Sequence, residues 1–245
     1  MNSQDFFFTE NIFTAETQGR KDLAKGRTTT FLFGIPLRLS AFVILLLISI
    51  PSFSQISGLT PIEDVTAFKT QLKIESASIH TIASEFTQTK HLSFFSEDIT
   101  TTGKFAFKKD NLVRWEYTDP FSYLIILNGE KVLIKDDEQA STFDAKSNEA
   151  FRQVNDVMVG LIGGQILDNK MFKARYFMNK STYLVELVPT EPTMKEFLQK
   201  LYLYIDTAGM IVTKIEMFEA GEDKTTIEFF NHKLNGEMSD DLFRI

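Results

Sequence analysis

Hydrophobic and polar residues alternate along most of the chain after residue 79. From Ile79 the period is two, which places Ile82, Ser84, Phe86 and Gln88 on one face of an extended segment. Similar segments follow, separated by turn compositions of which Asn128-Gly129 is the strongest hairpin signal. The pattern predicts about eleven strands, near residues 79–89, 101–108, 112–118, 123–127, 131–135, 140–143, 173–178, 182–188, 198–206, 211–220 and 225–230.

Two segments have helical periodicity instead. Thr60-Pro61 and Glu63 resemble a helix start, with a hydroxyl cap, a proline at the first position and an early acidic residue. The second helix is expected between Ser147 and Leu161 and is ended by Gly163-Gly164. With no alternation of single strands and helices and no internal repeat, the chain is predicted to form one α+β domain over 55–245. Its architecture is expected to be a large, strongly curved antiparallel sheet with helices against one face.

Residues 1–54 are predicted to be an N-terminal extension and a signal peptide. The uncharged run at 41–50 follows Arg38 and precedes Pro51, with small residues at Ser52 and Ser54. It is about half the length that a membrane-spanning helix needs, so we expect export and cleavage after Ser54; an uncleaved membrane anchor is the alternative. The first thirty residues are long and acidic for such a signal, which suggests a translation start nearer Phe31.

Composition and motifs exclude several kinds of chemistry. The chain has no cysteine, and its net charge of −7 argues against a nucleic-acid partner. The three histidines, His80, His91 and His232, are scattered, and we expect each to be a surface or strand residue. The acidic run 136–138 lacks the order of a calcium loop and is interpreted as a solvated turn. We therefore expect no catalytic residue, no metal, no cofactor and no enzymatic activity.

Large apolar side chains gather on one face of two neighbouring strands. Phe105 and Phe107 share a face of the first strand, and Val113, Trp115 and Tyr117 share a face of the second. Arg114 and Glu116 are expected on the opposite face, in solvent. Such a band is usually plain core, and that alternative stays open beside a binding cavity.

The helix at 147–161 runs into a glycine-rich apolar stretch. Its apolar residues next to that stretch are Val157, Met158, Leu161 and Ile162. Such a segment fits a movable lid over a hydrophobic pocket. The same spacing fits a helix that is docked permanently on the sheet.

Several motifs together resemble the periplasmic lipoprotein-carrier (LolA-like) family, in its Bacteroidetes-type version. The matching residues are Phe86-Thr87-Gln88-Thr89-Lys90, Gly103-Lys104-Phe105-Ala106-Phe107-Lys108-Lys109, Asn111, Val113-Arg114-Trp115, Tyr117 and Pro120. The resemblance covers most of the chain after residue 54 and is best over 79–133. It implies an incomplete β-barrel with an apolar cavity, closed by helices as a lid.

The resemblance also implies a function. The chain is expected to be a monomeric periplasmic carrier that holds the acyl chains of lipoproteins in its cavity. An inner-membrane ABC exporter would supply the cargo, and an outer-membrane acceptor would receive it. The aromatic band and the four lid residues are then the expected cavity lining. Two alternatives keep the fold: a carrier of a glycolipid or another lipid, and a lipid or stress sensor.

Two departures from the family pattern alter these expectations. The family's lid-latching arginine aligns with Lys109, and the proline after it aligns with Asp110. Lysine cannot make the forked contact of arginine, so we expect a differently held lid with Lys109 as its latch. The chain also stops at Phe243-Arg244-Ile245, where family members often continue, and its acceptor-facing end is expected to differ.

Overall fold

The computed structural model describes residues 56, 58–129, 131–144, 160, 167 and 170–245. The expected signal peptide and all but Gly160 of the second expected helix lie outside these residues. No helix in the described part of the chain is both long and apolar enough to cross a membrane.

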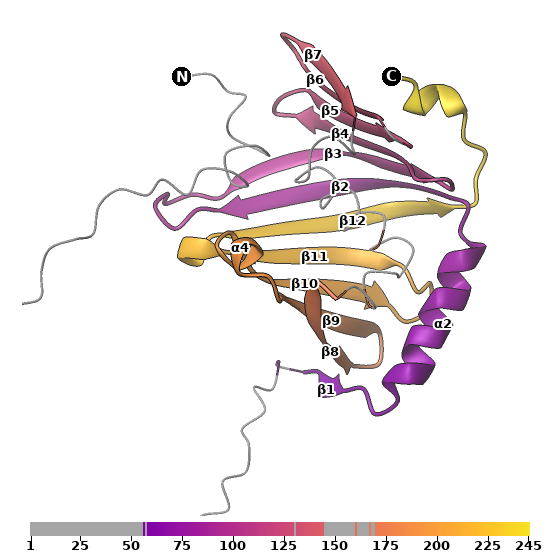
Figure 1. Ribbon diagram of the computed structural model, residues 1–245, viewed down its shortest axis with the longest axis vertical. Helices are drawn as coiled ribbons and strands as arrows, with labels where there is room; N and C mark the ends of the chain where they lie inside the picture. Colours follow the sequence, from indigo (N-terminus) through magenta and orange to yellow (C-terminus); the bar gives the residue numbers. More distant parts are fainter. Residues whose placement is uncertain (1–55, 57, 130, 145–159, 161–166, 168–169) are drawn as a thin grey trace, which may run out of the picture.

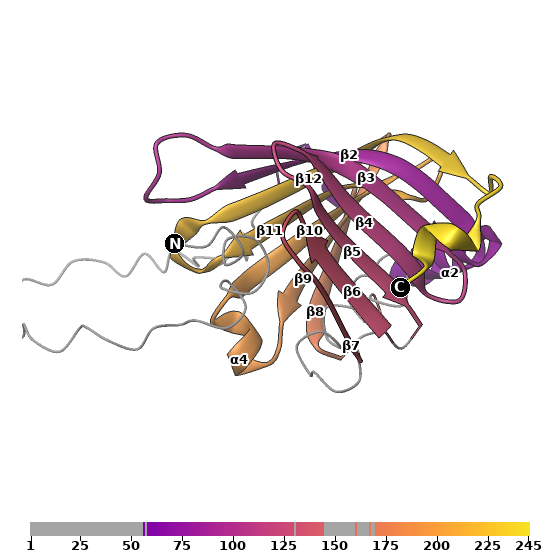
Figure 2. The same cartoon turned by 90° about the horizontal axis from the view of Figure 1, so that it is seen from above.

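In the part of the chain that the structure describes, twelve antiparallel strands form one sheet, in the order β1-β8-β9-β10-β11-β12-β2-β3-β4-β5-β6-β7. The strands are β1 (Thr60–Pro61), β2 (Thr81–His91), β3 (Ile99–Lys108), β4 (Leu112–Asp119), β5 (Tyr123–Asn128), β6 (Lys131–Asp136), β7 (Ala140–Asp144), β8 (Phe172–Met178), β9 (Thr182–Pro189), β10 (Leu198–Asp206), β11 (Val212–Glu219) and β12 (Lys224–Leu234). The sheet curves strongly but leaves β1 and β7 as separate edges (Figures 1 and 2). The expected incomplete barrel is confirmed, and strands β2 to β12 correspond to the eleven that the alternation predicts.

Four helical elements accompany the sheet within the described residues. They are α2 (Val65–Ser78), α4 (Pro192–Lys195), η3 (Ala220–Glu222) and η4 (Asp240–Phe243). Helix α2 lies across one end of the curved sheet (Figure 1). Its Phe68 and Leu72 are buried and join the main core cluster. This face of α2 covers the inner side of the sheet.

The predicted start of this helix at Pro61 is wrong. Thr60 and Pro61 form β1, which pairs with Phe177 and Met178 of β8 at the sheet edge, where proline is tolerated. The helix begins after Asp64, whose Oδ1 accepts a hydrogen bond from the Ala67 amide at 2.9 Å. A carboxylate that caps the third helical amide is a stronger start signal than the Thr-Pro pair.

The two faces of the sheet differ in chemistry. Inward residues such as Phe86, Val113 and Leu203 are almost completely buried in the main core cluster. On the outer face of β11, Glu216 accepts hydrogen bonds from the Tyr204 hydroxyl at 2.7 Å and from Lys224 Nζ at 2.9 Å. A second, smaller apolar cluster, which contains the buried Phe177 and Leu184, lies on the outer side of β8 and β9. This sidedness explains why a period of two identifies the strands so well.

The C-terminal segment covers part of the outer face. Phe243 of η4 is fully buried, and its carbonyl accepts a hydrogen bond from Asn128 Nδ2 at 2.6 Å. Arg114 donates to the Leu242 carbonyl at 3.2 Å and forms an ion pair with Glu116 at 3.0 Å. Arg114 and Glu116 are therefore on the outer face as expected, but η4 removes them in part from solvent.

Candidate functional site

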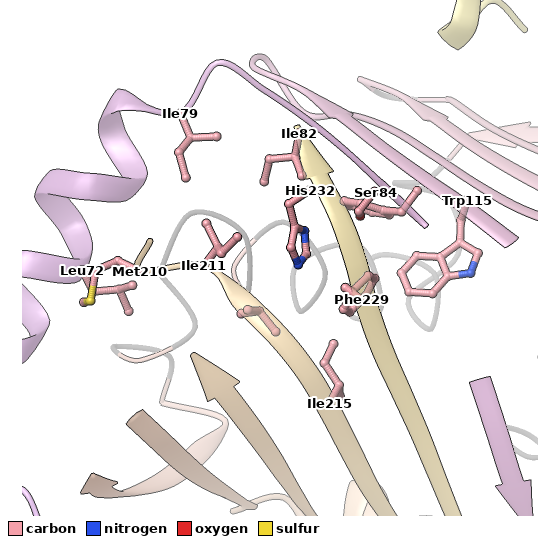
Figure 3. A pocket seen from close by; sticks show the side chains of 12 residues that line it. Leu72, Ile79, Ile82, Ser84, Trp115, Met210, Ile211, Ile215, Phe229 and His232 are labelled. Carbon is pink, nitrogen blue, oxygen red and sulfur yellow. The ribbon is translucent and has the colours of Figure 1, made fainter. Parts of the chain in front are cut away.

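An apolar pocket lies between α2 and the inner face of the sheet (Figure 3). Its lining residues come from α2 and the residue that caps its end, from strands β2, β3, β4, β11 and β12, and from the turn before β11. They are Leu72, Ile79, Ile82, Ser84, Phe105, Trp115, Met210, Ile211, Val212, Ile215, Phe229 and His232. All of them except Ser84 and His232 are apolar, so the arrangement suits a hydrocarbon ligand.

The pocket is small in this conformation. Its volume is about 60 Å³, whereas pockets for drug-sized ligands usually measure ~300 to 1,000 Å³. An acyl chain therefore fits only if the lining side chains separate. Met210, which is buried at the wall, has the unbranched and adaptable side chain that such repacking needs.

The structure divides the predicted aromatic band between pocket and core. Phe105 and Trp115 line the pocket. The other three members, Phe107, Val113 and Tyr117, are buried in the same cluster and do not line the pocket. The band is thus continuous core with a pocket at one side of it. Whether these residues contact a lipid stays a prediction.

Trp115 is packed among other aromatic rings. Its ring centroid lies 4.9 Å from that of Phe86, 5.3 Å from that of Phe105 and 5.8 Å from that of Phe229. Such tilted and edge-on contacts add to the stabilisation from burial. The neighbouring Tyr117 hydroxyl donates a hydrogen bond to Gln88 Oε1 at 3.0 Å, and burial raises the pKa of Tyr117. The aromatic cluster that contains the pocket residues Phe105, Trp115 and Phe229 is therefore uncharged and closely packed.

The expected latch residue contacts α2. Lys109 Nζ donates to the Ala77 carbonyl at 3.2 Å, and its backbone amide donates to the His80 carbonyl at 2.8 Å. A cation at the C-terminal end of a helix is favourable because carbonyl groups there lack helical partners. Lys109 thus fixes the helix that carries Leu72 into the pocket wall. Its role as the latch of a moving lid stays a prediction.

The residue after Lys109 explains one departure from the family pattern. Asp110 has a φ of 76° and Asn111 a φ of 64°. Proline fixes φ near −65° and cannot adopt this conformation. The β3–β4 turn is therefore built differently from one that contains proline at this position.

The four expected lid residues, Val157, Met158, Leu161 and Ile162, lie outside the described residues. Leu167, five residues after the last of them, is among the described residues and is buried in the main core cluster. Its carbonyl accepts a hydrogen bond from Lys69 Nζ of α2 at 3.1 Å. The chain at residue 167 is thus attached to the same helix that borders the pocket.

The alternation pattern did not single out several lining residues. Met210 belongs to the turn before β11, where no strand period applies, and Phe229 follows Ile227 on the inner face of β12. Ile211 was expected to begin the strand at 211–220 but directly precedes β11. His232 was expected to be a surface or strand residue. It is a strand residue, but its side chain reaches the pocket (Figure 3). Burial lowers the pKa of His232, and the nearby Phe229 carbonyl and Asp206 oppose this shift only in part.

The lowered pKa of His232 predicts that stability depends on pH. Below pH 6.5, the ordinary histidine value, the unfolded chain binds more protons than the folded one, so acid favours unfolding. We expect the free energy of unfolding to fall between about pH 7.5 and about pH 5.5, and to fall less in His232→Leu. Thermal melts of both proteins at the two pH values measure this. An equal fall in the two proteins contradicts the assignment to His232.

The described residues contain no group of three or more histidine, cysteine or acidic side chains that could hold a metal ion. The acidic run at 136–138 forms a turn, in which Asp136 Oδ1 accepts from the amides of Glu138 at 2.9 Å and Gln139 at 2.8 Å. This carboxylate stabilises its own turn, as the sequence interpretation expects.

Comparisons with known proteins agree with the architecture. Residues 77–245 match the family model described as "Outer membrane lipoprotein carrier protein LolA". The outer-membrane lipoprotein carrier protein of Xanthomonas oryzae pv. oryzae is 30% identical over 146 residues, which is 59% of this chain and 67% of that protein. The protein of the same name from Xanthomonas axonopodis pv. citri is 29% identical over 147 residues, 59% of this chain and 68% of that protein.

Among solved structures, a LolA superfamily protein from Nitrosomonas europaea is similar at 11% identity with a TM-score of 0.38. The match covers 72% of this chain and 97% of that one. This value is too low to support an argument of its own. The family match, in contrast, spans most of the chain and all strands from β2 to β12. The chain belongs to the LolA family of outer-membrane lipoprotein carrier proteins.

Proposed function

We propose that the protein is a non-enzymatic periplasmic carrier that shields the acyl chains of lipoproteins and shuttles them from the inner to the outer membrane. The apolar pocket on the inner face of the sheet is the observation that carries the proposal. Family membership supports it, because carriers of this family are periplasmic binding proteins. The expected export signal at 41–50 agrees with this compartment.

The proposed task has a clear energetic reason. Each acyl CH₂ that is exposed to water costs ~0.8 kcal/mol, so a lipoprotein with two or three chains needs an escort. Contact through Ile82, Ile215 and Phe229 is non-directional and tolerates different chain shapes. A small pocket that opens for cargo and closes without it also favours release, because the empty carrier keeps its apolar surface buried.

Transfer requires a donor and a recipient. We propose an inner-membrane ABC lipoprotein exporter as the donor and an outer-membrane acceptor as the recipient, with the carrier acting as a monomer between them. The family description of an outer-membrane lipoprotein carrier supports this direction. No cofactor is needed for the cycle, since binding and release involve no covalent step.

Fluorescence of Trp115 tests acyl binding directly. Trp115 is the single tryptophan of the chain and lines the pocket. We expect a saturable emission shift when purified protein is titrated with a triacylated lipopeptide, because acyl chains displace the rings around the indole. The deacylated peptide is the control and should give no shift. A flat response with both peptides, together with no binding by calorimetry, would contradict the carrier function.

The identity of the natural cargo is a separate question. Lipids that remain with protein purified under mild conditions can be extracted and identified by mass spectrometry. Acylated peptides in the extract support lipoprotein transport. A glycolipid or another free lipid supports a carrier of the same fold with different cargo.

A further inference from the structure

Two polar side chains interrupt the apolar wall of the pocket. Ser84 Oγ and both ring nitrogens of His232 are buried without a hydrogen bond of good geometry to any described residue, although the Phe229 carbonyl is near enough to the His232 ring to influence its pKa. The indole Nε1 of Trp115, in the same pocket, is likewise unpaired among the described residues. Ser84 is only 7% exposed. Buried polar groups in proteins are almost always paired, because an unpaired group loses its bonds to water without compensation. Their common position in one pocket makes these polar atoms available to a bound ligand.

A backbone irregularity directs His232 into the pocket. Phe230 pairs with Glu85 and Lys233 with Ala83, so two residues of β12, Asn231 and His232, face the single residue Ser84 of β2. Asn231 has a φ of 55°, a conformation that asparagine tolerates better than most residues. This extra residue shifts the alternation, so that His232 follows Phe229 on the inner face.

The bulge is fixed from the outer side. Asn231 Nδ2 donates a hydrogen bond to Glu85 Oε2 at 3.2 Å. Glu228 and Phe230, which precede His232 at a period of two, face outward and are exposed. Without the extra residue, His232 would continue this series and face outward too. Bulges recur where a strand must redirect a functional side chain. Figure 3 shows the imidazole of His232 among the lining residues of the pocket.

The chemistry of the pair indicates what it can bind. Burial keeps the pKa of His232 below its ordinary value, so at neutral pH the ring has one N–H donor and one acceptor nitrogen. The Ser84 hydroxyl can also donate. Neither group has a formal charge, and the acidic Asp206 is near enough to influence the ring. A free carboxylate is therefore disfavoured, whereas an uncharged carbonyl oxygen is well matched.

We propose that His232 and Ser84 donate hydrogen bonds to the ester or amide carbonyl at the head of a bound acyl chain. The pocket then fixes where the head of the chain lies, while the apolar wall covers the hydrocarbon. This inference rests on the proposed carrier function and assigns the polar part of its site. It also accounts for polar atoms that are otherwise costly to bury.

The test compares an ester with a hydrocarbon. Methyl dodecanoate and a straight-chain alkane of the same length are titrated into the full protein, with Trp115 fluorescence and calorimetry as readouts. His232→Leu should weaken ester binding about tenfold relative to alkane binding, since one buried hydrogen bond is lost. His232→Gln retains a donor and should keep most of the ester affinity. Ser84→Ala should give a smaller loss in the same direction.

His91→Leu is the matched control. The His91 ring is half-exposed, contacts Asp98 at 2.8 Å, and does not line the pocket, so this variant should bind both probes as the unchanged protein does. If neither probe binds the unchanged protein, the carrier function itself fails. If both probes bind and His232→Leu changes their affinities equally, the carrier function stands and the polar contact is overturned.

Discussion

Gly103→Ala is expected to lower the free energy of unfolding by roughly 3 kcal/mol or more, the upper range for overpacking a core. Gly103 pairs with Phe86 across strands β2 and β3. A Cβ atom at this position would lie 2.5 Å from Phe86 Cζ and would collide with the Glu116 carbonyl oxygen of β4. The carbonyl cannot move without breaking the β3–β4 ladder. Phe86 is completely buried, so its ring cannot move aside into solvent.

The clash also affects the pocket wall. The Phe86 ring lies 4.9 Å from the Trp115 ring and 6.4 Å from the Phe229 ring, and both of these residues line the pocket. Any relaxation of Phe86 therefore displaces the aromatic wall. Trp115 emission of the folded Gly103→Ala protein should differ from that of the unchanged protein.

Urea unfolding measures the predicted loss, and Gly236→Ala is the matched control. A Cβ at Gly236 meets no atom within 4 Å, so that variant should stay within about 0.5 kcal/mol of the unchanged protein. A loss below about 1 kcal/mol in Gly103→Ala would mean that the sheet absorbs the methyl group, and that the close approach of β3 and β4 is not fixed by packing.

The strands were predictable because one face of nearly every strand is buried. In β4, Val113, Trp115 and Tyr117 face inward at a strict period of two, and turn residues separate this strand from its neighbours. Local alternation is sufficient to find such strands. The order of the strands could not be predicted in this way, because the pairing of β12 with β2 joins segments far apart in the sequence, which local alternation does not encode.

The features that the sequence did not reveal depend on single residues or on distant contacts. The bulge at Asn231 adds one residue to β12, and this addition turns His232 inward where uninterrupted alternation would turn it outward. The start of α2 depends on the side chain of Asp64, which acts as a cap in place of the Thr-Pro pair. The burial of Phe243 requires η4 to fold back onto β4 and β5, which no local period encodes.

Phe229→Asp is expected to weaken binding of a triacylated lipopeptide by roughly a hundredfold or more, because a carboxylate in an apolar wall must be desolvated by the acyl chain. Phe229 lines the pocket, and its ring centroid lies 5.8 Å from those of Phe105 and Trp115 (Figure 3). It is only partly buried, so the substitution costs less stability than one at a fully buried core position. Phe229→Leu preserves the apolar surface and should retain most of the affinity.

Phe218→Asp is the matched control for this variant, since it makes the same change at another partly buried phenylalanine. Phe218 does not line the pocket. Its ring centroid lies 4.3 Å from Lys200 Nζ and 5.4 Å from Lys224 Nζ, so a new carboxylate at this position has cationic neighbours. Binding is measured by calorimetry at a temperature below the melting point of every variant. Only Phe229 faces the proposed path of the acyl chains. A similar loss of affinity in both variants would therefore indicate a general effect of the added charge. Normal binding by folded Phe229→Asp would place the acyl chains elsewhere in the molecule.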